Sequence, residues 1–330
     1  MLSLDGHSAL PVRRPQQAVA RRLERRLKRA SGRAALHSLT ANKSMKPRDV
    51  LLALTVMVVW ALNFPISKLG FHDFPPILFM ALRFAIVALL LCPFFRPPRA
   101  KLKQIVLVSV TLGTFHFAFM FSGLARTDSA TAALLVQSQV PFAALLAALF
   151  FKDRLTLRIV LGMAIAVAGV ALIAGEPRFG SDPLPVAMIL AASFAWAVAN
   201  IQFKQIGAID GFALTGWMAF FAWPQLLMLS LLIEDHHLAA IAGAGWHGWG
   251  AIAYGAIVIT ILSYGLWYPL MRKYAVNQVV PYTLLIPALT VGASYLILGD
   301  RLDWQSALGG VTTIVGVAII VLRRMPAGAR

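Results

Sequence analysis

Few polar side chains interrupt the long apolar stretches of this chain, and they are the groups that can do chemistry there. Trp60 is followed by Asn63 and Trp196 by Asn200, so each pair places a flat apolar ring and an amide on one side of a helix. A ring beside an amide suits a small amphipathic solute. Tryptophans that only pack against other helices or face lipid are the alternative.

His116 lies among four phenylalanines, of which Phe119 is one, in the middle of an apolar stretch. Its imidazole titrates near neutral pH in water, so it is either a proton carrier or a neutral, hydrogen-bonded wall residue. Gln137 and Tyr282 each precede a proline in an apolar run. A proline frees backbone groups that can meet a polar solute, or it kinks a helix for packing. We place the side chains of His116, Phe119, Gln137 and Tyr282 in the expected cavity wall.

Three cations fall within apolar stretches, where a charge is costly without a partner. Arg83 either snorkels to an interface or bonds carbonyls freed by Pro65, or it is a docking point for a substrate carboxylate. Lys68 and Lys204 occupy matched positions near opposite membrane faces, which suits interface anchors or gates. We expect Lys68 and Arg83 in the outer parts of the first two spans.

Motifs for enzymatic chemistry are missing from the sequence. It has no Gly-Lys-Ser/Thr phosphate loop, which argues against ATP as the energy source, and no set of residues with the spacing of a catalytic metal site. The run Glu234-Asp-His-His237 resembles a metal cluster but is more typical of a solvated turn. We therefore expect no enzyme, no cofactor and no bound metal.

The composition places these groups in a membrane. Of 330 residues, 59% are hydrophobic and only 13% are charged, and the net charge of +17 gathers in residues 1–48 and beside apolar stretches. We expect an all-α integral membrane protein with a disordered, basic cytoplasmic tail (1–48), lipid contacts and no nucleic-acid partner. Ten apolar stretches approach the length of a membrane span: 50–70, 76–95, 104–125, 129–151, 157–174, 184–206, 212–233, 247–271, 277–298 and 304–322.

The segment Lys152-Asp-Arg-Leu155 and the glycines after it recur as Gly299-Asp-Arg-Leu302 with its own glycines. We read the Asp-Arg pairs as helix caps or loop-end ion pairs, and the glycines as sites of close helix contact. Five spans separate the counterparts, which predicts two oppositely oriented five-helix repeats, 49–175 and 184–324. Such an inverted repeat lets a transporter expose one site alternately to either side. The Lys and Arg bias of the loops places both termini in the cytoplasm.

The motif Trp60-Ala-Leu-Asn-Phe-Pro-Ile-Ser-Lys68, the sequence Leu82-Arg-Phe84 and the paired Asp-Arg-Leu endings resemble the EamA family of the drug/metabolite transporter (DMT) superfamily. Phe115-His-Phe-Ala-Phe-Met-Phe121 and Tyr264-Gly-Leu-Trp267 look most similar to bacterial exporters of O-acetylserine and cysteine. Relatives commonly carry Glu where this chain has Asp in those endings. The resemblance implies a multi-pass protein of the bacterial inner (plasma) membrane.

We therefore predict a secondary transporter that exports small amino-acid-like metabolites, with O-acetylserine and cysteine as first candidates. An exporter of drugs or aromatic compounds, and a lipid-linked sugar flippase subunit, are the alternatives. This interpretation also allows a homodimer, in which the protein partner is a second copy of the chain. The expected substrate-binding residues are Trp60, Asn63, His116, Phe119, Gln137, Trp196, Asn200, Tyr264, Trp267 and Tyr282, and the expected gating or anchoring residues are Lys68, Arg83 and Lys204.

Overall fold

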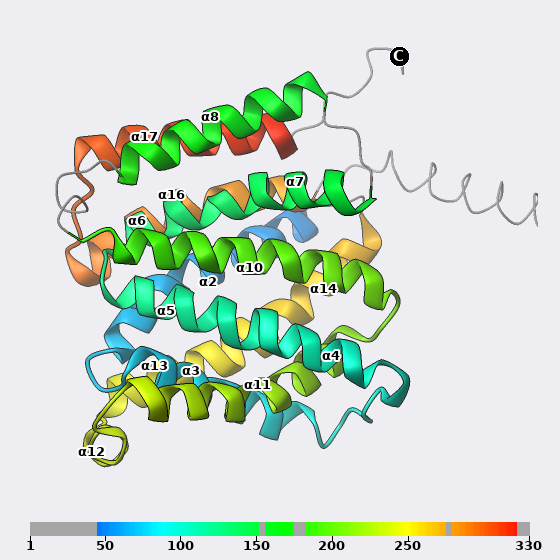
Figure 1. The fold of residues 1–330 in the computed structure, drawn as a ribbon, viewed down its shortest axis with the longest axis vertical. Helices are drawn as coiled ribbons and strands as arrows, with labels where there is room; N and C mark the ends of the chain where they lie inside the picture. The colour runs from blue at the N-terminus through cyan, green and yellow to red at the C-terminus, as the bar shows by residue number, and fades with distance from the viewer. Residues whose placement is uncertain (1–44, 152–155, 175–181, 275–278, 322–330) are drawn as a thin grey trace, which may run out of the picture.

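A computed structural model of the chain describes residues 45–151, 156–174, 182–274 and 279–321. Nearly all of the expected tail, the first Asp-Arg pair and the side chain of Lys204 lie outside the described residues. Within the described part, every regular element is a helix (Figure 1). Six of these helices are long and apolar enough to cross a membrane, and four shorter apolar helices accompany them. The all-α prediction is confirmed.

Some helices are regular along their whole length, and others change type part of the way along. The regular α-helices are α2 (Pro47–Gly70), α3 (Pro76–Leu91), α8 (Leu157–Ala174), α10 (Leu184–Ile206), α11 (Gly211–Ile233), α12 (His237–Gly243) and α17 (Trp304–Val321). The composite ones are η1–α4–η2–α5 (Arg99–Lys101, Leu102–Val108, Ser109–His116, Phe117–Ala125), α6–η3–α7 (Ser129–Leu135, Val136–Ser138, Gln139–Phe151), α13–η4–α14 (Trp246–Ala253, Tyr254–Ser263, Tyr264–Lys273) and η5–α16 (Val280–Leu284, Leu285–Leu298).

The irregular segments recur in the same order along the chain. The segments η2 and η4 are π-helices, and the next span in each case contains a 3-10 segment, η3 or η5. Pro141 and Pro287 lie in the first turn of the α-helix that follows each 3-10 segment, where a missing N–H is tolerated. π-helices of this kind often occur at functional sites, which directs attention to η2 and η4.

Pro65 does not break the first helix, although a proline inside a helix often does so. The helix α2 continues through it to Gly70. A proline leaves the carbonyl four residues earlier without its helical donor, and here the Thr290 hydroxyl of α16 donates to that Ala61 carbonyl at 3.2 Å. The freed backbone group is thus satisfied by a neighbouring helix.

The helices pack in pairs across the molecule (Figure 1). At the top of the view α8 lies beside α17, and at the bottom α3 packs against α11. A Cβ added at Gly169 of α8 or at Gly316 of α17 would lie under 3.0 Å from backbone atoms of the partner helix. These glycines therefore allow the close contact predicted for them.

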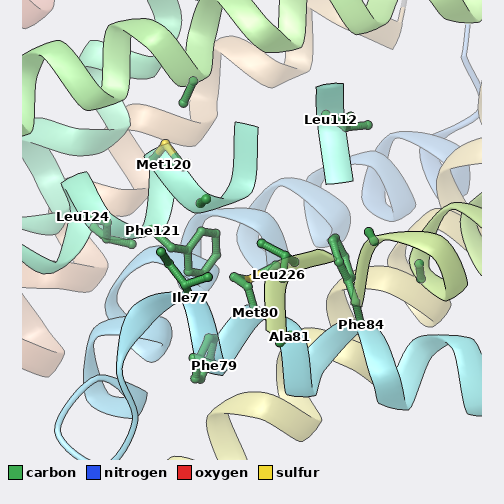
Figure 2. Packing of buried hydrophobic residues seen from close by; sticks show 14 of the residues in the cluster. Ile77, Phe79, Met80, Ala81, Phe84, Leu112, Met120, Phe121, Leu124 and Leu226 are labelled. Atoms are coloured by element: carbon green, nitrogen blue, oxygen red, sulfur yellow. The ribbon is translucent and has the colours of Figure 1, made fainter. Parts of the chain in front are cut away.

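The largest buried cluster lies where α3, α5 and α11 meet. Figure 2 shows Phe79, Met80 and Phe84 of α3 in one cluster with Phe121 of α5 and Leu226 of α11. The Phe79 and Phe121 rings stack with centroids 6.1 Å apart. This apolar packing fixes α3, which carries Arg83, against the rest of the molecule.

Candidate functional site

The first polar group lies where α2 packs against η4 and α14. The Trp60 indole donates its Nε1 hydrogen to the Ser263 hydroxyl at 2.7 Å. Its ring lies 5.6 Å from the Tyr264 ring and 5.2 Å from the Trp267 ring. Tyr282 packs on the same small hydrophobic cluster. Four of the predicted substrate-binding residues are thus brought together in an aromatic group beside the Ser263 hydroxyl.

Arg83 of α3 contacts α2 at Asn63, one turn beyond Trp60. Its Nη1 donates to the Asn63 amide oxygen at 3.2 Å and its Nη2 to the Thr260 hydroxyl at 3.3 Å. The side chain lies flat over Gly255, where a Cβ would come within 2.8 Å of the arginine Cδ. Close by, the Tyr254 hydroxyl donates to the Val59 carbonyl at 2.9 Å.

This geometry contradicts both anchoring interpretations of Arg83. The side chain is only 3% exposed and occupies the middle of α3 instead of its outer part, so it does not snorkel. The carbonyl freed by Pro65 is taken by Thr290, not by the guanidinium. Arg83 is a fully buried cation at a helix interface.

A second group lies where α10 packs against η2 and α5. The Trp196 ring is 5.1 Å from the His116 imidazole, which also touches the Phe117 ring at 4.8 Å. The His116 Nδ1 is hydrogen-bonded to the Ala192 carbonyl at 2.8 Å, which requires the donor hydrogen on Nδ1. His116 is therefore a buried ring whose orientation is fixed by α10.

Neutral polar side chains of α10 and α11 also contact η2. Gln225 of α11 accepts from the Thr114 hydroxyl at 2.8 Å and donates to the Ser109 hydroxyl at 3.0 Å. Gln202 of α10 donates to the Thr111 hydroxyl at 2.9 Å. These contacts join three helices without any charge.

Three further predicted site residues take no part in the ring contacts of these two aromatic groups. Gln137 is buried in η3. Phe119 is 37% exposed and stacks on Phe115 of its own helix, and Asn200 is exposed on α10. The two tryptophans lie at different helix interfaces, Trp60 where α2 meets η4 and α14, and Trp196 where α10 meets η2 and α5.

Several carboxylates cap the N-termini of helices on one side of the molecule, and Glu234 is the first of them. Glu234 accepts from the Ile77 and Leu78 amides at 2.8 and 2.9 Å, at the start of α3. The N-cap of α3 is Pro75, which offers no side-chain acceptor, so this carboxylate supplies the cap from α11. Glu234 is thus a structural link between α11 and α3, and not part of the solvated turn that its sequence neighbours suggest.

Two further carboxylates cap helices at the same end. Asp73 accepts from the Gly245 and Gly248 amides at 3.1 and 2.9 Å, at the start of α13. Asp300, from the second Asp-Arg pair, accepts from the Ser129 amide of α6 at 3.2 Å. The helix-cap interpretation of that pair is therefore correct for Asp300.

Lys68 also lies at the Glu234 end and donates to the Thr127 carbonyl at 2.8 Å. It lines a hollow of about 490 Å³ with Arg126, Asp128 and Asp182 among its other walls. A second hollow of about 410 Å³ lies beside Glu234. Neither hollow is lined by Trp60 or Trp196.

An ion pair joins α2 to α14 at the opposite end. Asp49 accepts from the Lys273 ammonium and from the Tyr274 hydroxyl, both at 2.5 Å. The hydrogen bond to Asp49 raises the pKa of Lys273 above its ordinary value. The contacts of α2 with α13–η4–α14 are thus held at one end by Asp49 and at the other by Asp73.

Sequence reasoning missed several of these groups. Hydroxyls and amides inside apolar runs are common and usually form local hydrogen bonds, so the sequence does not distinguish Thr260, Ser263 and Gln225. Asp49 also gives no distinct signal. It lies in the first turn of α2, where a carboxylate is common because it interacts favourably with the helix dipole. A usable signal was the spacing of Thr260 and Ser263, which puts both hydroxyls on one side of the helix.

The long apolar helices are those of a multi-pass membrane protein. The chain belongs to the EamA-like transporter family, which matches residues 48–175 and 183–322. This confirms the family predicted from the tryptophan and Asp-Arg-Leu motifs. The relatives include bacterial proteins, which place such a chain in the inner (plasma) membrane.

Two relatives share nearly the whole spanning region. A "Probable amino-acid metabolite efflux pump" of Salmonella typhimurium is 32% identical over 287 residues, which cover 84% of this chain and 96% of the relative. The protein of the same name in Escherichia coli K12 is 31% identical over 289 residues, with the same two coverages. A crystal structure with a TM-score of 0.55 covers 84% of this chain and 98% of its own. At 18% identity that likeness concerns the fold alone.

Proposed function

We propose that this protein is a secondary transporter that exports small amino-acid-like metabolites, with O-acetylserine and cysteine as the first candidates. The names of the two bacterial relatives support the substrate class. The single observation that carries the site is the pair of tryptophan-bearing interfaces, α2 with η4–α14 and α10 with η2–α5.

The architecture that we propose is ten spans in two five-helix repeats, 49–175 and 184–324, with both termini in the cytoplasm. The recurrence of a π-helix and then a 3-10 segment in each half supports this division. So does the pairing of each repeat's first helix, α2 or α10, with a π-helix from the other repeat. Oppositely oriented repeats can exchange conformations, which is the basis of alternating access.

The two interfaces offer a zwitterion complementary surroundings. Near Trp60 the solute meets aromatic rings, the Ser263 hydroxyl and the Asn63 amide. Near Trp196 it meets the His116 ring. Apolar walls with a few oriented polar groups are typical of sites for small solutes. Opening of either interface toward one membrane face presents these groups to the solute.

Uptake of labelled O-acetylserine and cysteine into inside-out vesicles tests the proposal, with and without an imposed proton gradient. We expect saturable uptake that disappears in vesicles without the protein. Stimulation by the gradient would make His116 the coupling candidate, and indifference to it would indicate a facilitator. Folded protein that accumulates neither solute would overturn the substrate assignment. A panel of aromatic cations and a lipid-translocation assay would then test the alternatives.

A further inference from the structure

Arg83 carries a charge that the described protein does not neutralise. The two acceptors that it reaches, Asn63 and Thr260, are neutral, and both distances are at the long end of the hydrogen-bond range. Its Nε is buried and has no hydrogen-bond partner among the described residues. A guanidinium has five N–H donors, so this one has capacity for a further acceptor.

Carboxylates are kept away from Arg83 throughout the described part of the chain. All of them lie in loops, at caps or in the first turn of a helix, and none is within ion-pair distance of the guanidinium. They are Asp49, Asp73, Asp128, Asp182, Asp210, Glu234, Asp235, Asp300 and Asp303. A buried cation without an anion is strongly disfavoured, so a matching anion is the expected ligand.

Packing alone does not require an arginine at this interface. On the paired helix α11, the neutral amide of Gln225 joins the other π-helix through its two hydroxyl contacts. Arg83 meets η4 in a comparable way, through Thr260 and over Gly255. A neutral side chain would serve the structural purpose in both places, so the charge has another purpose.

We propose that Arg83 binds the carboxylate of the transported solute and thereby selects carboxylate-bearing solutes over their decarboxylated or esterified analogues. The inference rests on the proposed export function and names the group that the site recognises. The carboxylate accepts from Nε and from one Nη, as in paired guanidinium–carboxylate contacts. Trp60, one turn of α2 away from Asn63, then lies beside the carbon skeleton of the solute.

Access to Arg83 depends on opening of the contacts between α2 and α13–η4–α14. In this structure the Asp73 contacts with α13 hold one end of them, and the Asp49 contacts with Lys273 and Tyr274 hold the other. The solute reaches the guanidinium when one of these ends separates. Separation of one end while the other stays closed exposes the site to one side at a time.

Competition in vesicles tests the selection with the unmodified protein. Inside-out vesicles take up labelled cysteine in the presence of unlabelled cysteine, cysteamine or cysteine methyl ester. Cysteamine lacks the carboxylate and the ester masks it, while both keep the amine and the thiol. We expect each analogue to compete at least about tenfold more weakly than cysteine. Equal competition by the three compounds would overturn the proposal.

Two substitutions then locate the selection. Arg83→Gln should abolish the preference for cysteine over its methyl ester. Arg83→Lys should keep the preference but bind more weakly, because a lysine cannot form the paired contact. Arg96→Gln makes the same change at an exposed position beyond the end of α3 and should leave both quantities unaltered. An unchanged preference in folded Arg83→Gln contradicts the proposal, and the Arg83→Lys result decides the matter if the glutamine variant does not fold.

Failure of this inference is distinguishable from failure of the proposed function. Binding can be measured separately from transport by the unfolding temperature of purified protein in detergent, with cysteine or its methyl ester added. Stabilisation by cysteine that Arg83→Gln lacks, together with no vesicle uptake, would leave the inference standing and the export function wrong. Equal uptake of cysteine and cysteamine would leave export standing and remove the role of Arg83.

Discussion

The paired helices α3 and α11 each carry one long polar side chain, and the two differ in how completely the protein satisfies them. Gln225 of α11 accepts from Thr114 and donates to Ser109. Arg83 of α3 has two long contacts with neutral acceptors and an Nε without a partner among the described residues. The amide is satisfied by the fold alone, whereas the guanidinium keeps an unpaired donor for the ligand that we propose.

The difference shows how related interfaces can acquire different tasks. Both side chains meet a π-helix, η2 or η4, whose wider turn leaves room for a lateral contact. With a neutral, fully paired residue the contact is structural. With a charged and incompletely paired residue the same geometry leaves a donor for the ligand that we propose, at a cost to the stability of the empty protein.

The largest effect is expected when the neutral interface receives a charge. Gln225→Arg buries a cation where no described carboxylate lies, which costs at least about 2.5 kcal/mol of unfolding free energy. Fluorescence-monitored unfolding in detergent measures the loss. Gln205→Arg, at an exposed position near the end of α10, is the matched control and should have little effect. Similar stability of the two variants would show that the Gln225 site tolerates charge and would remove the distinction drawn above.

Removal of each side chain sharpens the comparison. Gln225→Ala leaves the Ser109 and Thr114 hydroxyls without their partner and should cost about 1–3 kcal/mol. Arg83→Gln removes an unpaired charge and should cost less than about 1 kcal/mol in the absence of solute. The same unfolding assay ranks the two variants. The reverse ranking would mean that Arg83 is chiefly structural.

Much of the fold could be predicted from the sequence because it depends on composition and on short local signals. Apolar stretches bounded by prolines and charged loops locate the helices, and the recurring Asp-Arg-Leu endings indicate the family. The glycine contacts between α8 and α17 follow from small residues in both helices. These features depend on local sequence, so no long-range information was needed.

The site was predicted less well because it depends on which helices meet. Trp60, Tyr264 and Trp267 were expected together and lie together, but Trp196 and His116 form a separate group. The π-helices leave no plain mark in the sequence. The partners of Arg83 come from other helices, α2 and η4, so the distance between Arg83 and every described carboxylate is visible only in three dimensions.

A smaller change tests whether the aromatic group at the Arg83 interface is held by its hydrogen bond. Trp60→Phe keeps a ring but loses the 2.7 Å bond to Ser263, and it should cost about 1 kcal/mol. Trp246→Phe, at a position that is 78% exposed, is the control. Ser263→Ala combined with Trp60→Phe should add little beyond either change alone, since both remove one contact. Full additivity would show that the bond contributes nothing.

The smallest effect concerns the link between the two helices being compared. Glu234, at the end of α11, caps the first turn of α3, so it ties the helix of Gln225 to the helix of Arg83. Glu234→Gln keeps one oxygen acceptor but loses the negative charge, and it should cost less than about 1 kcal/mol. Asp235→Asn changes the adjacent, exposed carboxylate in the same way and should be neutral. The hydrogen-exchange rates of the Ile77 and Leu78 amides measure directly whether this cap is formed. Protection that is unchanged in Glu234→Gln would mean that the carboxylate does not hold α3, and that the two polar interfaces are joined by apolar packing alone.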